Sequence, residues 1–225
     1  MRSLSLLPLL LFFVLLVMLP FVFGQVFASA LVKLKLDPTT ALLVVIGIFP
    51  GSPINIPVKR ISRTESVPAD PLAVFGLSRW WPAFQQVRRE TVIAVNVGGC
   101  LIPVALAIYE TAHVILAGRQ PLSGLLLAIF INTVACYWSA KPIEGIGIAM
   151  PGLFPPLLAT VCALSFVPDQ APPVAFVAGV LGPLLGADLL HLRDIEKIAT
   201  GIASIGGAGT FDGIVLSGIV AAYLA

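Results

Sequence analysis

Residues 204–225 read Ser204-Ile-Gly-Gly-Ala-Gly-Thr-Phe-Asp-Gly-Ile-Val-Leu-Ser-Gly-Ile-Val-Ala-Ala-Tyr-Leu-Ala225, and the only charged side chain among them is Asp212. The rest of the stretch is apolar or small enough to lie in lipid. A carboxylate at membrane depth costs several kcal/mol unless it is protonated, paired or hydrated. The stretch therefore indicates a membrane protein, and Asp212 marks a candidate functional site.

The composition of the whole chain supports the same class. Of the 225 residues, 58% are hydrophobic and 11% are charged, with a mean hydropathy of +1.03, whereas soluble domains carry roughly 25% charged residues. Several windows of about 18 residues are almost free of charge, which is enough to cross a hydrocarbon core as a helix. The apolar runs are continuous rather than alternating, so they predict helices and not a barrel. We expect an all-α, polytopic membrane helix bundle, a single integral membrane domain over residues 1–225.

Seven apolar segments predict six or seven spans. The first is too long for the apolar region of a secretory signal, which favours an uncleaved anchor. The second contains Pro50-Gly51-Ser52-Pro53-Ile54-Asn55-Ile56-Pro57, which prevents a regular helix, so this segment is predicted to be broken or re-entrant. The segments are about 5–30, 39–57, 91–109, 122–138, 145–167, 173–190 and 201–225.

The polar stretch 58–90 is predicted to be the main extramembrane loop. Whether or not the second segment crosses, most of the thirteen Lys and Arg residues fall on the side of this loop and of the shorter loop 191–200. Basic residues collect on the cytoplasmic side, so both loops are expected to be cytoplasmic in a multi-pass protein of the plasma or inner membrane. The side of the N-terminus stays open. The lipid bilayer is the expected partner, and the chain has no basic patch with interleaved aromatics to bind nucleic acid.

A second acid, Asp188, ends the sixth apolar segment, and glycines at the start of the seventh predict that the two acids meet. Glycine disfavours a regular helix, so an unwound start of the last segment would bring Asp212 near Asp188. Thr210 or Asp212 would then begin a short final helix whose free amides face a pocket lined by glycine backbone. The predicted ligand-binding residues are Asp188, Asp212, Gly206, Gly207, Gly209, Thr210 and Asn55.

Each acid also has a simpler interpretation. Asp212 would act only as an N-cap that accepts hydrogen bonds from helix amides. Asp188 would form an ordinary interfacial ion pair with Arg193 or Lys197. Both alternatives stay open at this point.

Other polar residues are assigned structural roles. Asn96 and Asn132 are expected to hydrogen-bond from helix to helix, while Glu110 and His113 are expected in a solvated loop. No metal site and no cofactor are predicted, because the three cysteines lack metal-like spacing and suit packing. These cysteines are Cys100, Cys136 and Cys162.

Three motifs carry a resemblance to a known family: residues 141–156, which begin Lys141-Pro-Ile-Glu-Gly, residues 178–190 around Asp188, and residues 203–214 around Asp212. Together with Asn55-Ile56-Pro57 and Gly98-Gly99-Cys-Leu-Ile-Pro103, they closely resemble the domain of unknown function 1614 family of bacterial and archaeal membrane proteins. The resemblance covers nearly the whole chain. It implies a multi-pass membrane protein and no particular activity.

Two functions are compatible with this pattern. Interrupted spans and intramembrane acids favour transport of a small solute, ion or proton. The chain is small for a self-contained transporter and shows no convincing internal repeat, so this hypothesis predicts a homodimer.

The alternative is an intramembrane aspartyl protease in which Asp188 and Asp212 form a catalytic dyad. The likeness to presenilin and to the signal-peptide and prepilin peptidases is incomplete. Ala187 replaces the tyrosine that presenilins place before the first acid, and Gly209-Thr-Phe-Asp212 lacks the Gly-x-Gly-Asp spacing. A membrane scaffold without catalysis is the third hypothesis.

Overall fold

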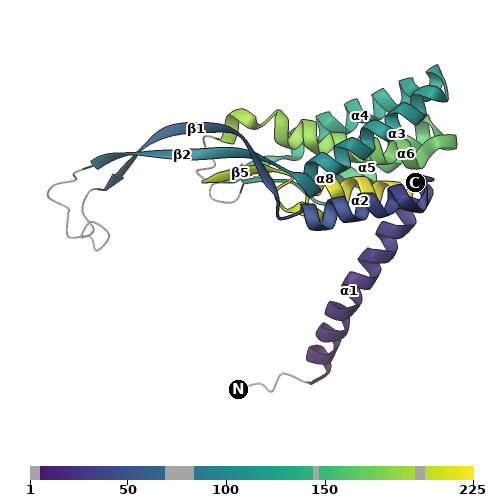
Figure 1. The fold of residues 1–225 in the computed structure, drawn as a ribbon, viewed down its shortest axis with the longest axis horizontal. Helices are drawn as coiled ribbons and strands as arrows, with labels where there is room; N and C mark the ends of the chain where they lie inside the picture. Colours follow the sequence, from purple (N-terminus) through teal and green to yellow (C-terminus); the bar gives the residue numbers. More distant parts are fainter. Residues whose placement is uncertain (1–5, 69–83, 144–146, 196–200) are drawn as a thin grey trace.

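The computed structural model describes residues 6–68, 84–143, 147–195 and 201–225 (Figure 1). Within these ranges the chain is mostly helical and contains seven α-helices. They are α1 (Leu6–Lys33), α2 (Pro38–Gly51), α3 (Ile102–Leu116), α4 (Arg119–Ser139), α5 (Phe154–Phe166), α6 (Ala171–Pro183) and α8 (Gly213–Leu224).

Four helical stretches in the described part of the chain are long and apolar enough to cross a membrane. They are Leu10–Lys33, Val97–Leu116, Arg119–Ser139 and Pro168–Asp194. The helices α2, α5 and α8 are apolar but shorter. Length and composition thus identify four candidate spans, against the six or seven expected from the sequence.

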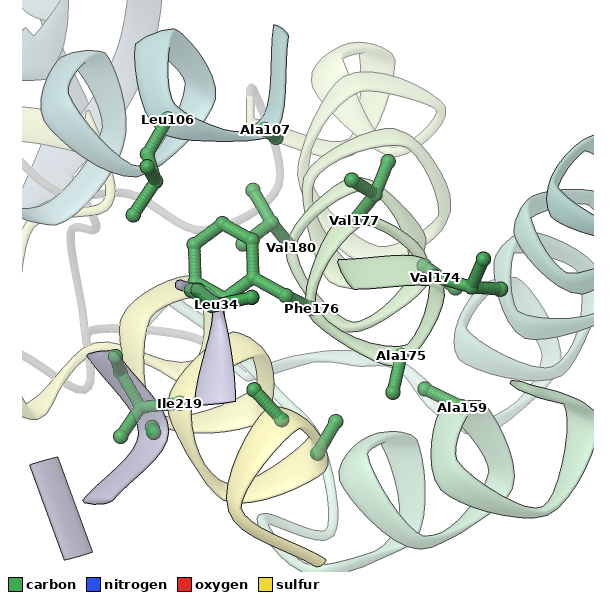
Figure 2. Packing of buried hydrophobic residues seen from close by; sticks show 14 of the residues in the cluster. Leu34, Leu106, Ala107, Ala159, Val174, Ala175, Phe176, Val177, Val180 and Ile219 are labelled. Atoms are coloured by element: carbon green, nitrogen blue, oxygen red, sulfur yellow. The ribbon is translucent and has the colours of Figure 1, made fainter. Parts of the chain in front are cut away.

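Helix α6 is the centre of the bundle. The helices α3, α4, α5 and α8 all pack against it, and its residues are apolar on every face, as expected for a helix surrounded by others. Phe176 and Val180 of α6 lie between Leu106 of α3 and Ile219 of α8 (Figure 2). The core of the molecule is therefore built around one apolar helix.

Small residues and one buried amide bring neighbouring helices into close contact with α6. A side chain at Gly179 would collide with the backbone carbonyl of Ser217 in α8. On the other face, the Asn132 side chain of α4 donates a hydrogen bond of 2.8 Å to the Ala178 carbonyl. The predicted helix-to-helix role of Asn132 is confirmed. Close approach of this kind replaces the hydrophobic effect as the source of helix association in lipid.

The all-α prediction is incomplete, because the described residues also form strands. The strands β1 (Asn55–Pro68) and β2 (Phe84–Asn96) make a long antiparallel hairpin that extends beyond one end of the helices (Figure 1). The strand β5 (Ile202–Ile205) pairs parallel to β2. A second, small antiparallel pair is formed by β3 (Lys141–Ile143) and β4 (Gly147–Ala149).

The hairpin occupies parts of two segments that were predicted to be a loop and a membrane span. Where the structure describes the expected loop 58–90, the chain forms β1 and β2. The span expected from residue 91 begins at Val97, because Thr91-Val92-Ile93 and Val95 are β-branched or strand-forming residues that pair with β1 and β5. Residues 69–83, at the middle of the expected loop, lie outside the described part.

The broken second segment consists of a short helix followed by a strand. Asp37 caps α2 by accepting hydrogen bonds from the Thr40 hydroxyl at 2.6 Å and from the Thr40 amide at 3.0 Å. These bonds lower the pKa of the Asp37 carboxyl, and the bond from the Thr40 hydroxyl has the larger effect. The helix ends at Gly51, and β1 begins at Asn55. The break falls where the prolines predicted it, and the described backbone there turns into a strand and not into a second helical arm.

Helix α1 stands apart from the bundle along most of its length (Figure 1). Its last turns are anchored by Phe27, Ala30 and Leu31, which are buried. The side chains described between Leu10 and Val22 are largely exposed. Apolar side chains in such numbers suit a lipid environment rather than water.

The contact between Gly179 of α6 and Ser217 of α8 gives a test of the close packing of these two helices. Gly179→Ala should lower the free energy of unfolding by roughly 1–3 kcal/mol, because a methyl group must displace the α8 backbone. Gly24→Ala, in the interior of α1 with nothing within 4 Å of the added methyl group, should be neutral or stabilising by up to about 1 kcal/mol. Unfolding of the purified variants in detergent, followed by circular dichroism, measures both. Equal stability of the two variants would contradict the close α6–α8 contact.

Candidate functional site

The site is built where three interruptions of helical structure meet at the hairpin end of the bundle. The first interruption is the break after α2, and the second is the π-helical turn η2 (Val97–Leu101) that joins β2 to α3. The third is the segment from β5 through the 3-10 turn η6 (Gly209–Phe211) to the start of α8. Backbone groups at such interruptions lack helical partners, so they must find others within the protein.

Asn96 connects the first two interruptions. Its amide nitrogen donates to the Ser52 carbonyl at 2.6 Å and to the Asn55 side-chain oxygen at 3.0 Å. Its own side-chain oxygen accepts from the Gly99 amide at 2.7 Å and so caps η2. Asn96 is fully buried, and three of its hydrogen-bonding positions are satisfied. The predicted helix-to-helix bond of Asn96 is wrong in its elements, because Asn96 ends the strand β2 and bonds to Ser52 after α2 and to Asn55 of β1.

Ser52 connects the first interruption to the third. Its hydroxyl donates to the Ile48 carbonyl at 2.8 Å and accepts from the Thr210 amide at 2.8 Å. The hydroxyls of Ser52 and Thr210 lie 2.7 Å apart. Because the Ser52 proton is already directed at Ile48, the Thr210 hydroxyl is the donor in this pair. Ser204 completes the network by donating to the Asn55 side-chain oxygen at 2.5 Å.

Glycine is required where the backbones of these segments touch. A side chain at Gly99 would collide with the carbonyl of Gly206, and one at Gly98 would collide with the carbonyl of Ile48. Gly206 and Gly209 also have φ angles of +72° and +61°, a region that favours glycine. The glycines therefore allow the third interruption to lie directly against the π-helical turn η2.

A cavity of about 380 Å³ lies beside this junction, and both predicted acids line it. Asp188 comes from the π-helical turn η4 (Leu184–Leu189), which continues α6, and Asp212 precedes α8. π-helical turns are rare in proteins, and those that occur are frequently found at functional sites. The remaining lining residues are Gly147, Ile148, Leu192, Ile195, Ile202, Ala203, Ser204, Ile205, Gly206, Gly207 and Ala208.

The two acids differ in their local partners. The oxygens of Asp212 accept from the backbone amides of Ile214 at 3.0 Å and Ala208 at 3.2 Å, so Asp212 is the N-cap of α8. The Asp188 carboxylate accepts a hydrogen bond from the Gly206 backbone amide, and the negative charge of Asp212 repels that of Asp188. Asp212 therefore combines a capping role with a place in the cavity wall.

The cavity has a polar wall and an apolar wall. Asp188, Asp212 and Ser204 lie among glycine backbone, whereas Ile148, Leu192, Ile195 and Ala203 also belong to a small hydrophobic cluster under the sheet. No Lys, Arg or His occurs among the described lining residues. A recess lined by two acids and by no described basic side chain favours a proton or a positively charged group.

The structure brings together only part of the predicted site. Asp188, Asp212, Gly206 and Gly207 line the cavity, whereas Gly209, Thr210 and Asn55 belong to the adjoining network. No ion pair joins Asp188 to Arg193 within the described residues, and Lys197 lies outside them. Ser204 and Ser52 also belong to the site and were not among the predicted residues, although Ser52 lies inside the predicted break.

The described residues contain no group of three or more His, Cys, Asp or Glu side chains arranged to hold a metal ion. The three cysteines are buried and unpaired. Each lies on a different helical element, in η2, α4 or α5, as packing residues do.

The fold and the cavity define a mainly helical protein that has helices of membrane-crossing length and an acidic recess at the end of its bundle. A family model described as a protein of unknown function (DUF1614) matches residues 49–224, and the chain belongs to this family. No curated protein and no solved structure matches the chain. The resemblance found in the sequence motifs is confirmed, and the match includes all residues of the cavity.

Replacing Asp212 separates its capping role from its charge. Asp212→Ala should lower the free energy of unfolding by about 1–2 kcal/mol, because the Ile214 and Ala208 amides lose their acceptor. Asp212→Asn keeps an acceptor oxygen and should cost less than half as much. Denaturant titration of both variants in one detergent measures the difference. Equal losses for the two variants would show that capping does not account for the stability that Asp212 provides.

Proposed function

We propose that this protein is an integral membrane transporter that moves a small cationic solute or protons by way of the cavity between Asp188 and Asp212. The observation that carries this proposal is the pair of acids in one cavity without a basic lining residue among those described. Two carboxylates at such a place repel each other and are poorly solvated. A proton or a cation that binds between them relieves both penalties.

The form of the cavity supports reversible binding of a small ligand. Its volume of about 380 Å³ is at the lower end of small-molecule sites. Interrupted helices surround it, and transporters commonly place substrate sites where unwound helices expose backbone amides and carbonyls. The mixed walls suit a ligand with a positive end near Asp188 and an apolar body against Leu192 and Ile195.

The proposed arrangement in the membrane follows from the helices and from the distribution of charge. The four long helices cross a plasma or inner membrane, and α2, α5 and α8 complete the bundle as shorter segments. The strands β1 and β2 and the 191–200 segment lie on the cytoplasmic side, where basic residues collect. Two copies of the chain form the working unit, because one chain of this size shows no internal repeat.

An intramembrane aspartyl protease is the second candidate, favoured by the same shared cavity. A dyad of that kind requires carboxylates that exchange one proton and activate a water molecule. Both Asp212 oxygens already accept hydrogen bonds from backbone amides, so neither oxygen is free to activate a water molecule as a protease dyad requires. Transport places fewer demands on Asp212, and so it is the better supported function.

Flux into liposomes tests the transport proposal. The purified full chain is reconstituted with a pH-sensitive dye inside, and H⁺, Na⁺, K⁺ and methylammonium are offered in turn. Asp188→Asn and Asp212→Asn should each reduce flux of the transported ion at least about 10-fold, because removing one buried charge changes binding by several kcal/mol. Asp169→Asn, an exposed acid in the turn η3 (Pro168–Gln170), should match the wild type. Unchanged flux in both site variants would refute the proposal.

Cleavage of a reporter span in the same liposomes decides between transport and proteolysis. Transport predicts that no cleavage depends on Asp188 or Asp212. Cleavage that both Asn variants abolish would favour the protease instead. A scaffold role predicts wild-type behaviour of both variants in the flux assay and in the cleavage assay.

A further inference from the structure

Glu110 is a fully buried acid outside the cavity. It lies in α3, only 1% of its surface is exposed, and its Oε1 atom has no hydrogen-bond partner. The expectation that Glu110 lies in a solvated loop is therefore wrong. His113, one turn further along α3, is exposed and stacks on Tyr109 with ring centroids 4.4 Å apart. Sequence spacing alone could not separate the buried face of α3 from its exposed face.

The helices around α3 offer Glu110 no described counter-charge. The elements packed against α3 are α2, α4, α6, α8 and the turn η2. Neither α2 nor α6 contains an ionisable side chain. No salt bridge to Glu110 occurs among the described residues. The ionisable groups of the other elements are Arg119, Cys136 and Tyr137 in α4, Tyr223 in α8 and Cys100 in η2, beside Tyr109 and His113 of α3 itself.

We propose that Glu110 is a proton-binding site inside the bundle, and that it passes protons between the cavity and the end of the bundle remote from the hairpin. An ionised carboxylate without a partner is costly in an apolar interior, and a bound proton removes that charge. The relay part of this inference rests on the proposed transport function. The proton binding follows from the burial of Glu110 alone.

A proton fits this position better than a metal ion. Hard cations such as Ca²⁺ and Mg²⁺ require about six or more oxygen ligands, whereas one carboxylate is present here. Among the described residues, no group of three or more His, Cys, Asp or Glu side chains that could hold a metal ion includes Glu110. A proton is therefore the ligand that fits Glu110.

The depth of Glu110 suits a relay. Gly99 touches Gly206 at the level of the cavity, and Glu110 follows Gly99 by eleven residues, which is about 16 Å along a helix. A further six residues, about 9 Å, lead to the other end of α3 at Leu116. Ser217 of α8, five residues after Asp212, has a buried hydroxyl with no hydrogen-bond partner. Polar groups thus occur at three depths of the bundle.

Labelling with dicyclohexylcarbodiimide tests the proton directly. This apolar reagent adds a protonated carboxyl across its C=N bond, and the adduct rearranges to a stable N-acylurea that mass spectrometry locates. The full chain in detergent should carry the adduct on Glu110 at pH 6, with at least about 5-fold less at pH 9, because the ionised form does not react. Glu110→Gln should remove the adduct, and exposed Asp169 should remain unlabelled. No adduct at either pH, or equal amounts at both, would overturn the inference.

Proton flux in liposomes tests the relay. Glu110→Gln, which keeps the shape and removes the exchangeable proton, should reduce flux at least about 10-fold, and Glu110→Asp should restore part of it. Wild-type flux in Glu110→Gln would overturn the relay. The labelling result separates this inference from the proposed function. Asp188→Asn should leave the Glu110 adduct unchanged, so failure of transport at the cavity does not remove evidence for the proton site.

Discussion

The need to satisfy backbone groups away from water governs this structure. Three segments leave helical geometry at one end of the bundle, and their backbone amides and carbonyls must find partners outside a regular helix. Ser52 and Asn96 answer that need by joining the break after α2 to the start of α3 and to Thr210. Gly99 and Gly206 allow the chains to approach closely enough for these bonds to form. The junction holds the cavity in place.

The same junction explains why an acidic recess is tolerated within an apolar protein. Both side-chain oxygens of Asp212 accept hydrogen bonds from backbone amides. Asp188 lies in a π-turn and accepts a hydrogen bond from the Gly206 amide. The carboxylates therefore stabilise the irregular backbone as well as lining the cavity. Asp212 is both the N-cap of α8 and part of the cavity wall, so its capping role does not exclude the binding role proposed for it. The Asp212→Asn variant, which retains an acceptor oxygen, can separate them.

The sequence predicted features that depend on local backbone preferences, such as helix breaks at proline and glycine. It did not predict strands whose pairing partners are distant in the chain. The proline and glycine pattern of 50–57 located the break, and the glycines before Asp212 located the unwound start of the last segment. The β1–β2–β5 sheet was missed, because β5 pairs with β2 more than one hundred residues earlier. The charged residues of 58–90 resembled a loop, although β-branched residues recur along the stretch at Val58, Ile61, Thr64 and Val67 and permit a strand. Glu110 was misplaced because burial depends on which face of α3 meets α6.

The sequence by itself determined that this chain is apolar, helical in its larger part and acidic at two interrupted segments, since composition, proline and glycine act locally. The sequence also predicted that Asp188 and Asp212 meet, whereas tertiary structure alone decided that no described basic residue lines their cavity and that Glu110 is buried. Those outcomes depend on distances between segments far apart in the chain. Close packing around α6 sets these distances, and no local pattern encodes them.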